Sequence, residues 1–219
     1  MFAKALKAIW YWLSRWGCRV FCILSFRFRV YGTDNVPRKG AFLLASNHQS
    51  YLDPVLCGVF LKRRMHYLAR DSLFRNRVFS ALIFSLNAIP VKRDEVDLSA
   101  MKTVIARLKE GAGVCLYPEA TRTPDGRIAS FKAGFGLLAR RGQATVVPVL
   151  IDGAFESWPR DRKIFSLGRL IVVWYGRPIT AEQVQAMKDE ELAAVVTDTL
   201  RRMQRRSRLR HGRKPYSYP

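Results

Sequence analysis

The sequence predicts an α/β domain with a mixed, mostly parallel sheet flanked by helices and preceded by an amphipathic helical segment. Three observations support this fold class. Apolar or alternating runs typical of strands recur between helical patterns along the chain. The hydrophobic fraction is 49%, and 219 residues are enough to bury one full core. No internal repeat and no Gly/Ser-rich linker divides the chain.

The first part of the predicted domain carries three strands and the start of a helix. The segment 26–31 alternates apolar residues with arginines, which is typical of a half-buried strand. A turn rich in Gly, Asn and Pro separates it from an apolar strand at 41–46. Pro54 suits the first position of a helix, and Asp53 suits the cap before it. A third strand is expected at 65–69.

The second part alternates helices and strands more regularly. Asp71 or Ser72 is expected to cap a helix that runs towards Leu86. Asp97 opens an amphipathic helix, which Gly111 ends. The remaining expected elements are strands at 88–91, 113–117, 144–151 and 170–175, a helix at about 132–141, and a last helix that begins at a Thr180–Gln183 capping box and ends in an arginine run.

The formal net charge of +21 is concentrated at the two ends of the chain. Residues 1 to 33 contain six bases and no acid, and residues 201 to 219 contain eight bases and no acid, so the ends supply 14 of the 21 net charges. Such ends favour a polyanionic partner, either nucleic acid or an anionic lipid surface. Charge alone does not choose between the two.

The N-terminal segment favours the lipid surface. Apolar residues recur at helical spacing from Phe2 to Leu24, with bases between them and three tryptophans where the two faces meet. Arg15 and Arg19 interrupt every window that is long enough to span a bilayer. We therefore expect an interfacial helix with a basic face and an aromatic-rich apolar face. The alternative is an ordinary amphipathic helix that covers the core.

Two segments at strand exits carry candidate catalytic chemistry. His48 and Asp53 can meet only if His48 lies in the turn and Asp53 stands at the start of the following helix, as Pro54 suggests. A carboxylate that accepts from one imidazole nitrogen leaves the other nitrogen free to act as a base. On spacing alone the alternative, in which Asp53 only caps and His48 only packs, stays open.

The second segment mixes a carboxylate, a hydroxyl and a guanidinium. Glu119, Thr121 and Arg122 leave the buried strand at 113–117, and arginine is the side chain suited to bidentate contact with phosphate. A surface salt bridge between Glu119 and Arg122 is the alternative. Further cations that could contact the same anion are Lys92, Arg93 and Lys132.

In order and spacing, these blocks resemble the motifs of the glycerolipid acyltransferase family, the lysophosphatidic acid acyltransferases and their relatives. The block from Asn47 to Asp53 (Asn-His-Gln-Ser-Tyr-Leu-Asp) matches the family's Asn-His-x-Ser-x-x-Asp. The block from Ile89 to Arg93 (Ile-Pro-Val-Lys-Arg) is similar to the second motif, which ends in a basic residue. The block from Tyr117 to Arg122 (Tyr-Pro-Glu-Ala-Thr-Arg) is similar to Phe-Pro-Glu-Gly-Thr-Arg. Phe131-Lys132-x-Gly134 and Val146-Val147-Pro148 also agree, and the resemblance covers about residues 32 to 178.

One position departs from the family pattern. Ala120 stands where the family usually has glycine. A Cβ atom at this position disfavours a positive φ and crowds a close approach of the backbone to an anion.

The resemblance implies a transfer of an acyl group from acyl-CoA or acyl-carrier protein to the free hydroxyl of 1-acylglycerol 3-phosphate, which gives phosphatidic acid. His48 would remove the proton of the acceptor hydroxyl, and Asp53 would orient the imidazole. No acyl-enzyme is formed, and neither a metal nor another cofactor is expected. The implied substrate-binding residues are Asn47, Ser50, Lys92, Arg93, Glu119, Thr121, Arg122 and Lys132, with the arginines on the acceptor phosphate.

These implications complete the predicted organisation. Residues 1–26 form a membrane-interfacial helical segment, 27–205 an acyltransferase domain and 206–219 a basic tail. The expected location is peripheral or monotopic on the cytoplasmic face of the cell membrane, against an anionic surface. The four cysteines lie in apolar runs without metal-ligand spacing, so packed thiols and no metal site are expected.

Three alternatives differ in function class. The acceptor could be glycerol 3-phosphate or another lipid alcohol. An inactive acyl-binding scaffold has only Ala120 in its favour. A non-catalytic nucleic-acid-binding protein would use the basic ends, but no groove-reading or base-stacking module is recognisable, so no specific nucleic acid is expected. A serine hydrolase is disfavoured because Ser50 lies in no Gly-x-Ser-x-Gly elbow.

Overall fold

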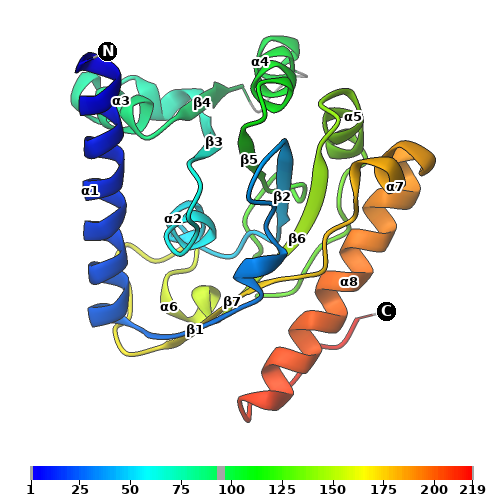
Figure 1. Ribbon diagram of the computed structural model, residues 1–219. Helices are drawn as coiled ribbons and strands as arrows, with labels where there is room; N and C mark the ends of the chain where they lie inside the picture. Colours follow the sequence, from blue (N-terminus) through cyan, green and yellow to red (C-terminus); the bar gives the residue numbers. More distant parts are fainter. Residues whose placement is uncertain (1, 93–96, 219) are drawn as a thin grey trace.

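The computed structural model describes residues 2–92 and 97–218, with the side chains of 2–4 left aside. Within these ranges seven strands form one sheet in the order β1-β7-β6-β2-β5-β3-β4 (Figure 1). The strands are β1 (Arg27–Tyr31), β2 (Phe42–Ser46), β3 (Met65–Arg70), β4 (Ala88–Val91), β5 (Gly113–Leu116), β6 (Thr145–Asp152) and β7 (Leu170–Tyr175). The predicted α/β class with a mostly parallel sheet is confirmed.

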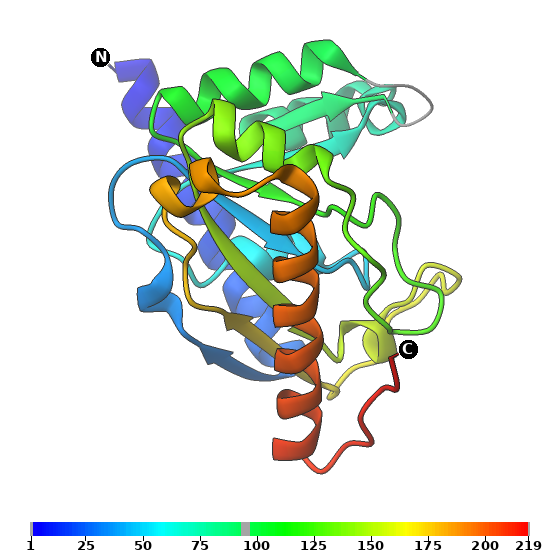
Figure 2. The same cartoon turned by 90° about the vertical axis from the view of Figure 1, so that its right-hand side faces the viewer.

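Helices cover both faces of the sheet. They are α1 (Phe2–Ser25), α2 (Asp53–Gly58), α3 (Arg77–Ser85), α4 (Leu98–Lys109), α5 (Gly134–Arg141), α6 (Ala154–Ser157), α7 (Ala181–Ala186) and α8 (Asp189–Arg210), with short 3₁₀ turns at Thr33–Asn35 and Asp71–Phe74. In Figure 1, α1, α2 and α3 lie to the left of the sheet and α5, α7 and α8 to its right. Figure 2 looks onto α8, which crosses the sheet along most of its length.

The central strand β2 explains why two cores form. All five of its residues are buried, because alternate side chains point into opposite layers. Leu43 and Ala45 belong to the core under α4, α5 and α8. Phe42 and Leu44 belong to the core under α1 and α2. A strand covered on both faces reads as a continuous apolar run, as β2 and β5 do.

The direction of the strands determines where loops gather. All paired strands are parallel except β6 and β7, which are antiparallel. β2 lies between β5 and β6, so the carboxyl ends of these three strands meet at one edge. This is the edge at which open α/β sheets bind ligands.

Two helix predictions are wrong in detail. The helix expected from Asp71 or Ser72 begins only at Arg77, because Asn76 adopts an extended conformation and its side chain accepts from the backbone of Phe79. The expected single last helix is divided into α7 and α8 by two extended residues at 187–188. Three acids in the first turn of α8, which favour a helix N-terminus, were the overlooked signal.

The two ends of the chain form long helices on opposite sides of the molecule (Figure 1). The predicted boundary between residues 205 and 206 falls inside α8, which continues to Arg210. Within the described residues, no helix combines the length and the apolar character needed to cross a bilayer.

Candidate active site

His48 lies in the loop that follows β2, two residues beyond the end of the strand. Its Nδ1 is 2.7 Å from Oδ2 of Asp53, and its side chain is 9% exposed while that of Asp53 is 0% exposed. No described group hydrogen-bonds the other ring nitrogen, Nε2. The imidazole therefore has one nitrogen held by a carboxylate and one available to a substrate, which is the arrangement of a general base.

Asp53 is oriented by the loop that it follows. Its Oδ2 also accepts from the backbone N–H of Gln49 at 2.6 Å and of Ser50 at 2.8 Å. Asp53 is the first residue of α2, and its side chain does not cap that helix, contrary to the expectation from the sequence. The carboxylate points back to the loop instead, because the N–H groups of Val55 and Leu56, which a cap at Asp53 would use, already donate to the carbonyl of Leu52. The loop and the dyad therefore form one hydrogen-bonded unit.

Tyr117, at the exit of β5, forms one wall of the site. Its ring stacks on the imidazole of His48, with ring centroids 4.2 Å apart and planes at 19°. Its hydroxyl donates to Sγ of Cys57 in the buried layer, at 3.7 Å. The contact with Cys57 fixes the position of the Tyr117 ring, and the stacked ring in turn fixes the plane of the His48 imidazole.

Glu119 braces the same loop from the neighbouring strand. Its Oε1 accepts from the backbone N–H of His48 at 2.7 Å, and its Oε2 accepts from that of Ala129 at 2.9 Å. The side chain is buried, and this burial raises the pKa of Glu119 to about 7, although the two backbone donors oppose the rise. Glu119 therefore holds the backbone of His48, whereas the sequence suggested a role in acceptor binding.

Two other predicted binding residues also have internal partners. Asn47 pairs with both backbone groups of Ile151, donating to the carbonyl and accepting from the N–H at 2.8 Å each. Ser50 donates to the carbonyl of Trp158 at 2.7 Å. Both side chains are buried. They join the loop after β2 to β6 and to the segment beyond it, and so position His48.

Arg122, which the sequence predicted to bind an anion, lines a cavity. The cavity, of about 310 Å³, lies between the segment that follows β5, helix α8 and the C-terminal segment. Its lining includes acidic and basic side chains, among them Glu119, Thr121, Arg122, Arg127, Arg201 and Tyr218. The guanidinium of Arg122 lies 3.5 Å over the ring of Tyr51. Its Nη1 is buried and has no hydrogen-bond partner among the described residues. An orphaned guanidinium N–H beside a cavity is suited to a phosphate oxygen.

The three other predicted cations are placed differently. Lys92 follows β4, three strands away from β2 and thus roughly 14 Å across the sheet. It lines a separate cavity of about 520 Å³ with His66 and Arg107. Lys132 is exposed, and its backbone N–H donates to the carbonyl of Pro118. Arg93 lies outside the described residues.

Ala120 adopts a positive φ, the conformation that its Cβ atom disfavours. Its φ is +63°, in the left-handed region that glycine adopts freely. Its N–H donates to the carbonyl of Tyr117 at 2.9 Å, closing the turn that carries Glu119. The turn therefore keeps the shape that a glycine would allow, at a conformational cost of roughly 1 kcal/mol.

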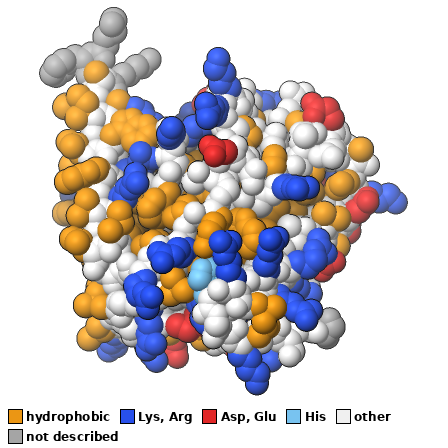
Figure 3. Space-filling view, turned by 60° about the horizontal axis from the view of Figure 1, so that its bottom comes forward, with side chains coloured by type: hydrophobic (Ala, Val, Ile, Leu, Met, Phe, Trp, Pro, Cys, Tyr) orange, Lys and Arg blue, Asp and Glu red, His pale blue; other side chains and the backbone are white. Residues whose placement is uncertain are grey.

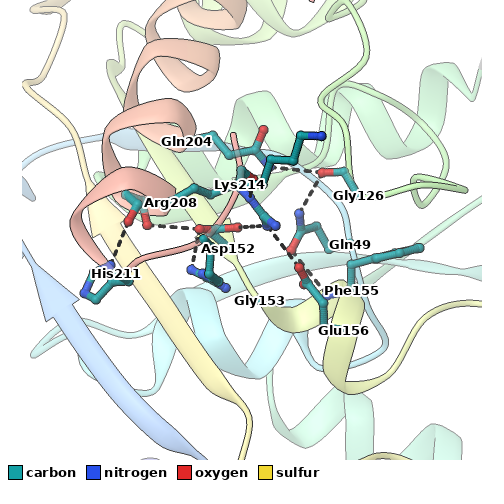
Figure 4. A network of polar contacts seen from close by, with 12 residues as sticks. Gln49, Gly126, Asp152, Gly153, Phe155, Glu156, Gln204, Arg208, His211 and Lys214 are labelled. Carbon is teal, nitrogen blue, oxygen red and sulfur yellow. Dashed lines mark hydrogen bonds and ion pairs between the residues drawn. The ribbon is translucent and has the colours of Figure 1, made fainter. Parts of the chain in front are cut away.

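Sequence reasoning missed a group of residues around Gly126 (Figure 4). The amides of Gln49 and Gln204 each donate to the Gly126 carbonyl at 3.0 Å. Tyr218 donates to Gln204 and accepts from the N–H of Ile128 at 3.0 Å. The loop behind Arg122 is thus held by α8 and by the C-terminal segment. The only signal in the sequence was the Tyr-Ser-Tyr ending, which no motif explained.

A second group neutralises Asp152, the last residue of β6 (Figure 4). Arg208 contacts Asp152 at 3.1 Å and Glu156 at 3.0 Å, and Arg213 contacts Asp152 at 2.5 Å. Ser207 also donates to Asp152 at 3.0 Å. Two of the arginines in the supposed basic tail are therefore internal partners of a buried carboxylate.

The fold and the site together define an α/β protein with a His48–Asp53 dyad at a strand exit and, at Glu119, a cavity lined in part by arginines. Comparison with known proteins agrees. A model of the acyltransferase family matches residues 27–152. The 1-acyl-sn-glycerol-3-phosphate acyltransferase of Bacillus subtilis (strain 168) is 30% identical over 81% of this chain and 87% of that protein. A chloroplastic enzyme of the same name from Arabidopsis thaliana, LPAT1, is 26% identical over 75% of this chain and 47% of that protein.

A solved structure supports the same assignment. The crystal structure of the 1-acyl-sn-glycerophosphate (LPA) acyltransferase PlsC from Thermotoga maritima has a TM-score of 0.73 and 26% identity, and the match covers 88% of this chain and 74% of that one. The chain belongs to the acyltransferase family, as the motifs indicated.

Proposed function

We propose that this acyltransferase moves an acyl group from acyl-CoA or acyl-carrier protein to the free hydroxyl of 1-acylglycerol 3-phosphate, giving phosphatidic acid. The observation that carries the mechanism is the 2.7 Å contact between Nδ1 of His48 and Asp53 beside an arginine-lined cavity. The names of the relatives in bacteria and plants support the acceptor.

In the proposed reaction, Nε2 of His48 takes the proton of the acceptor hydroxyl as its oxygen attacks the thioester carbonyl carbon. A new C–O bond forms, the C–S bond breaks, and the thiolate leaves with the proton that the imidazolium returns. Asp53 stabilises the imidazolium through Nδ1–H and keeps Nε2 aimed at the hydroxyl. The chemistry requires no resident metal or cofactor.

The acceptor phosphate is proposed to bind Arg122, whose buried Nη1 has no described partner. Arg127 and Arg201 line the same cavity and add positive charge. Lys132 is exposed, and its backbone N–H donates to the carbonyl of Pro118, the neighbour of Glu119. Lys92 lies in a different cavity, where an anionic group of the acyl donor is the fitting ligand. Placing two anionic substrates needs this excess of positive charge.

The membrane is the proposed surface on which the enzyme works, as a peripheral or monotopic protein on the cytoplasmic face. On α1, apolar side chains such as Leu13 and Trp16 are 60% and 66% exposed. The guanidinium of Arg15 lies 3.9 Å over the ring of Trp12. An exposed apolar face edged by aromatic residues and bases is typical of a helix lying in a bilayer interface.

The deciding experiment measures acyl transfer from palmitoyl-CoA to lysophosphatidic acid in detergent, for the wild type and for His48→Ala. We expect the variant to lose roughly 10²–10⁴ in kcat while its thermal unfolding stays cooperative. Asp53→Asn should reduce kcat more than it raises KM. Activity of His48→Ala at the wild-type level would refute the general base.

The acceptor is tested with Arg122→Ala. This variant should raise the KM for lysophosphatidic acid and leave that for a neutral monoacylglycerol unchanged. Equal loss for the two acceptors would refute the phosphate assignment. If the wild type is inactive in this assay, glycerol 3-phosphate is tested as the acceptor and acyl-carrier protein as the carrier of the acyl donor. No transfer with any of these substrates would refute the proposed enzyme.

A further inference from the structure

Helix α3 is short, apolar and almost entirely uncovered. Six of its nine residues are Val, Phe, Ala, Leu or Ile, yet none of the nine is buried. Val78 is 82% exposed, and Phe79, Leu82 and Phe84 are between 40% and 49% exposed. Leu73, in the 3₁₀ turn before the helix, is 44% exposed. An apolar surface of this kind on a soluble domain is typical of an interaction site.

The surface of α3 continues the exposed face of α1. The indole N–H of Trp10 donates to Oγ of Ser85 at 2.9 Å, which joins the end of α3 to the middle of α1. Both helices lie on the same side of the sheet (Figure 1). Figure 3 shows the row of hydrophobic side chains along α1, which includes Leu6, Ile9, Leu13 and Trp16 at 56% to 66% exposure.

The charges around α3 fit an anionic partner. The helix contains no acid and begins with an exposed base, Arg77. The segment before it carries exposed bases at Arg70 and Arg75 against one exposed acid, Asp71. Bases beside exposed apolar side chains match the two parts of a lipid interface, the anionic headgroups and the acyl region below them.

We propose that α3 is a second membrane-docking element, which inserts Val78, Phe79 and Leu82 into an anionic bilayer surface beside α1. This inference rests on the membrane association proposed above and adds the second contact. Two contacts at an angle to each other restrict rotation of the domain about the axis of α1, which one helix alone does not. The active site would then meet the bilayer in a single orientation.

The test measures sedimentation of the intact protein with vesicles of phosphatidylcholine and phosphatidylglycerol. The double variant Val78→Ser, Leu82→Ser should bind these vesicles at least about tenfold more weakly than the wild type, because two side chains no longer transfer into the apolar region. The matched control is Leu209→Ser, which removes a side chain that is 59% exposed on α8, on the other side of the molecule. The control should bind like the wild type.

The contribution of the bases to vesicle binding is tested separately. Arg75→Gln with Arg77→Gln should weaken binding to the mixed vesicles and leave binding to pure phosphatidylcholine vesicles unchanged. Acyl transfer to an acceptor dissolved in detergent should be the same in all variants, because none of the substituted residues belongs to the dyad or lines its cavity or the cavity at Lys92. A wild type that is inactive with every acceptor and donor would refute the proposed function and not the docking element.

Unchanged vesicle binding by the Val78→Ser, Leu82→Ser variant would overturn the inference. If the oligomeric state of that variant, measured by light scattering, also changed, α3 would instead be assigned to a contact with a second copy of the chain.

Discussion

Two buried carboxylates lie at the exits of the strands on either side of β2, the strand that carries the loop of His48, and their charges are compensated by different kinds of group. Glu119 follows β5 and accepts from two backbone N–H groups. Asp152 ends β6 and contacts two guanidinium groups. Burial raises the pKa of both. Of these two buried carboxyl groups, that of Glu119 is held by neutral donors and responds to pH, and that of Asp152 has its charge balanced by permanent countercharges.

The difference separates two roles in the same site. Arginines at Asp152 fasten α8 and the C-terminal segment to the end of the sheet (Figure 4). Backbone donors at Glu119 position the loop of His48 without adding a cation next to the imidazole. A cation there would disfavour the protonated imidazole that the reaction needs.

The largest expected effect comes from breaking the countercharge. Arg208→Ala should lower the free energy of unfolding by about 3 kcal/mol or more, because it leaves buried carboxylate charge only partly compensated. Urea unfolding measures this, with Arg205→Ala on the exposed face of α8 as the control, expected to change stability by less than about 0.5 kcal/mol. Similar losses in both variants would show that Arg208 does not differ from a surface arginine.

The next effect is the pH response of Glu119. Its pKa rises from an ordinary 4.5 to about 7 on folding. Between these values the folded protein binds more protons than the unfolded chain, so stability falls as pH rises through this window. The wild type should lose up to about 3 kcal/mol between pH 4.5 and 8 that Glu119→Gln does not lose.

Urea titrations of the two proteins at several pH values provide this measurement. Glu119→Gln should also carry a constant cost of about 1–3 kcal/mol, because an amide offers only one acceptor to two N–H donors. Glu190→Gln, which changes an exposed acid, should keep the wild-type slope. Parallel curves for wild type and Glu119→Gln would contradict the assigned pKa.

A smaller effect is expected at Tyr218, which joins the loop that follows Glu119 to helix α8. Tyr218→Phe removes the hydroxyl that joins the N–H of Ile128 to Gln204 and should cost about 1–2 kcal/mol. It should also raise the KM for the phosphorylated acceptor, since Tyr218 lines the cavity. Tyr216→Phe retains the ring that lies 4.2 Å from the guanidinium of Arg208 and is the control. If steady-state kinetics show the same KM for the Tyr218→Phe and Tyr216→Phe variants, the hydroxyl of Tyr218 takes no part in acceptor binding.

The smallest effect, and the only gain, is expected at Ala120. Ala120→Gly should stabilise the protein by about 0.5–1 kcal/mol, because relief of the positive φ exceeds the entropy that glycine adds to the unfolded chain. Thermal unfolding would show a raised midpoint. A lowered midpoint would mean that the turn carries no strain at this position.

The fold could be predicted because local apolar patterns determine it, whereas the dyad was predicted from the resemblance to family motifs, since spacing alone left it open. Five buried residues in β2 and the Pro54 signal were enough to place His48 and Asp53 at a strand exit. The roles of Asn47 and Glu119 could not be predicted. Their partners are backbone groups at Ile151 and Ala129, and nothing in a side-chain pattern reveals a backbone donor brought close by folding.

The C-terminal charges show a second limit of sequence reasoning. A run of arginines predicts a solvated, polyanion-seeking face, and Arg205 is indeed exposed. Arg208 belongs to the same run and is buried against Asp152. The two differ only in the face of α8 on which they lie, so the distinction requires knowledge of which helix face meets the sheet.

The pairing of β1 with β7 has a consequence for the order in which the protein is made. Arg27 lies opposite Leu170, so the first strand of the chain has no neighbour until nearly all of the domain has left the ribosome. Long-range parallel pairing of this kind forms late in folding. Helix α1 is complete long before that, with its apolar face uncovered. With the membrane association proposed above, the nascent chain reaches the lipid surface first and completes its sheet there.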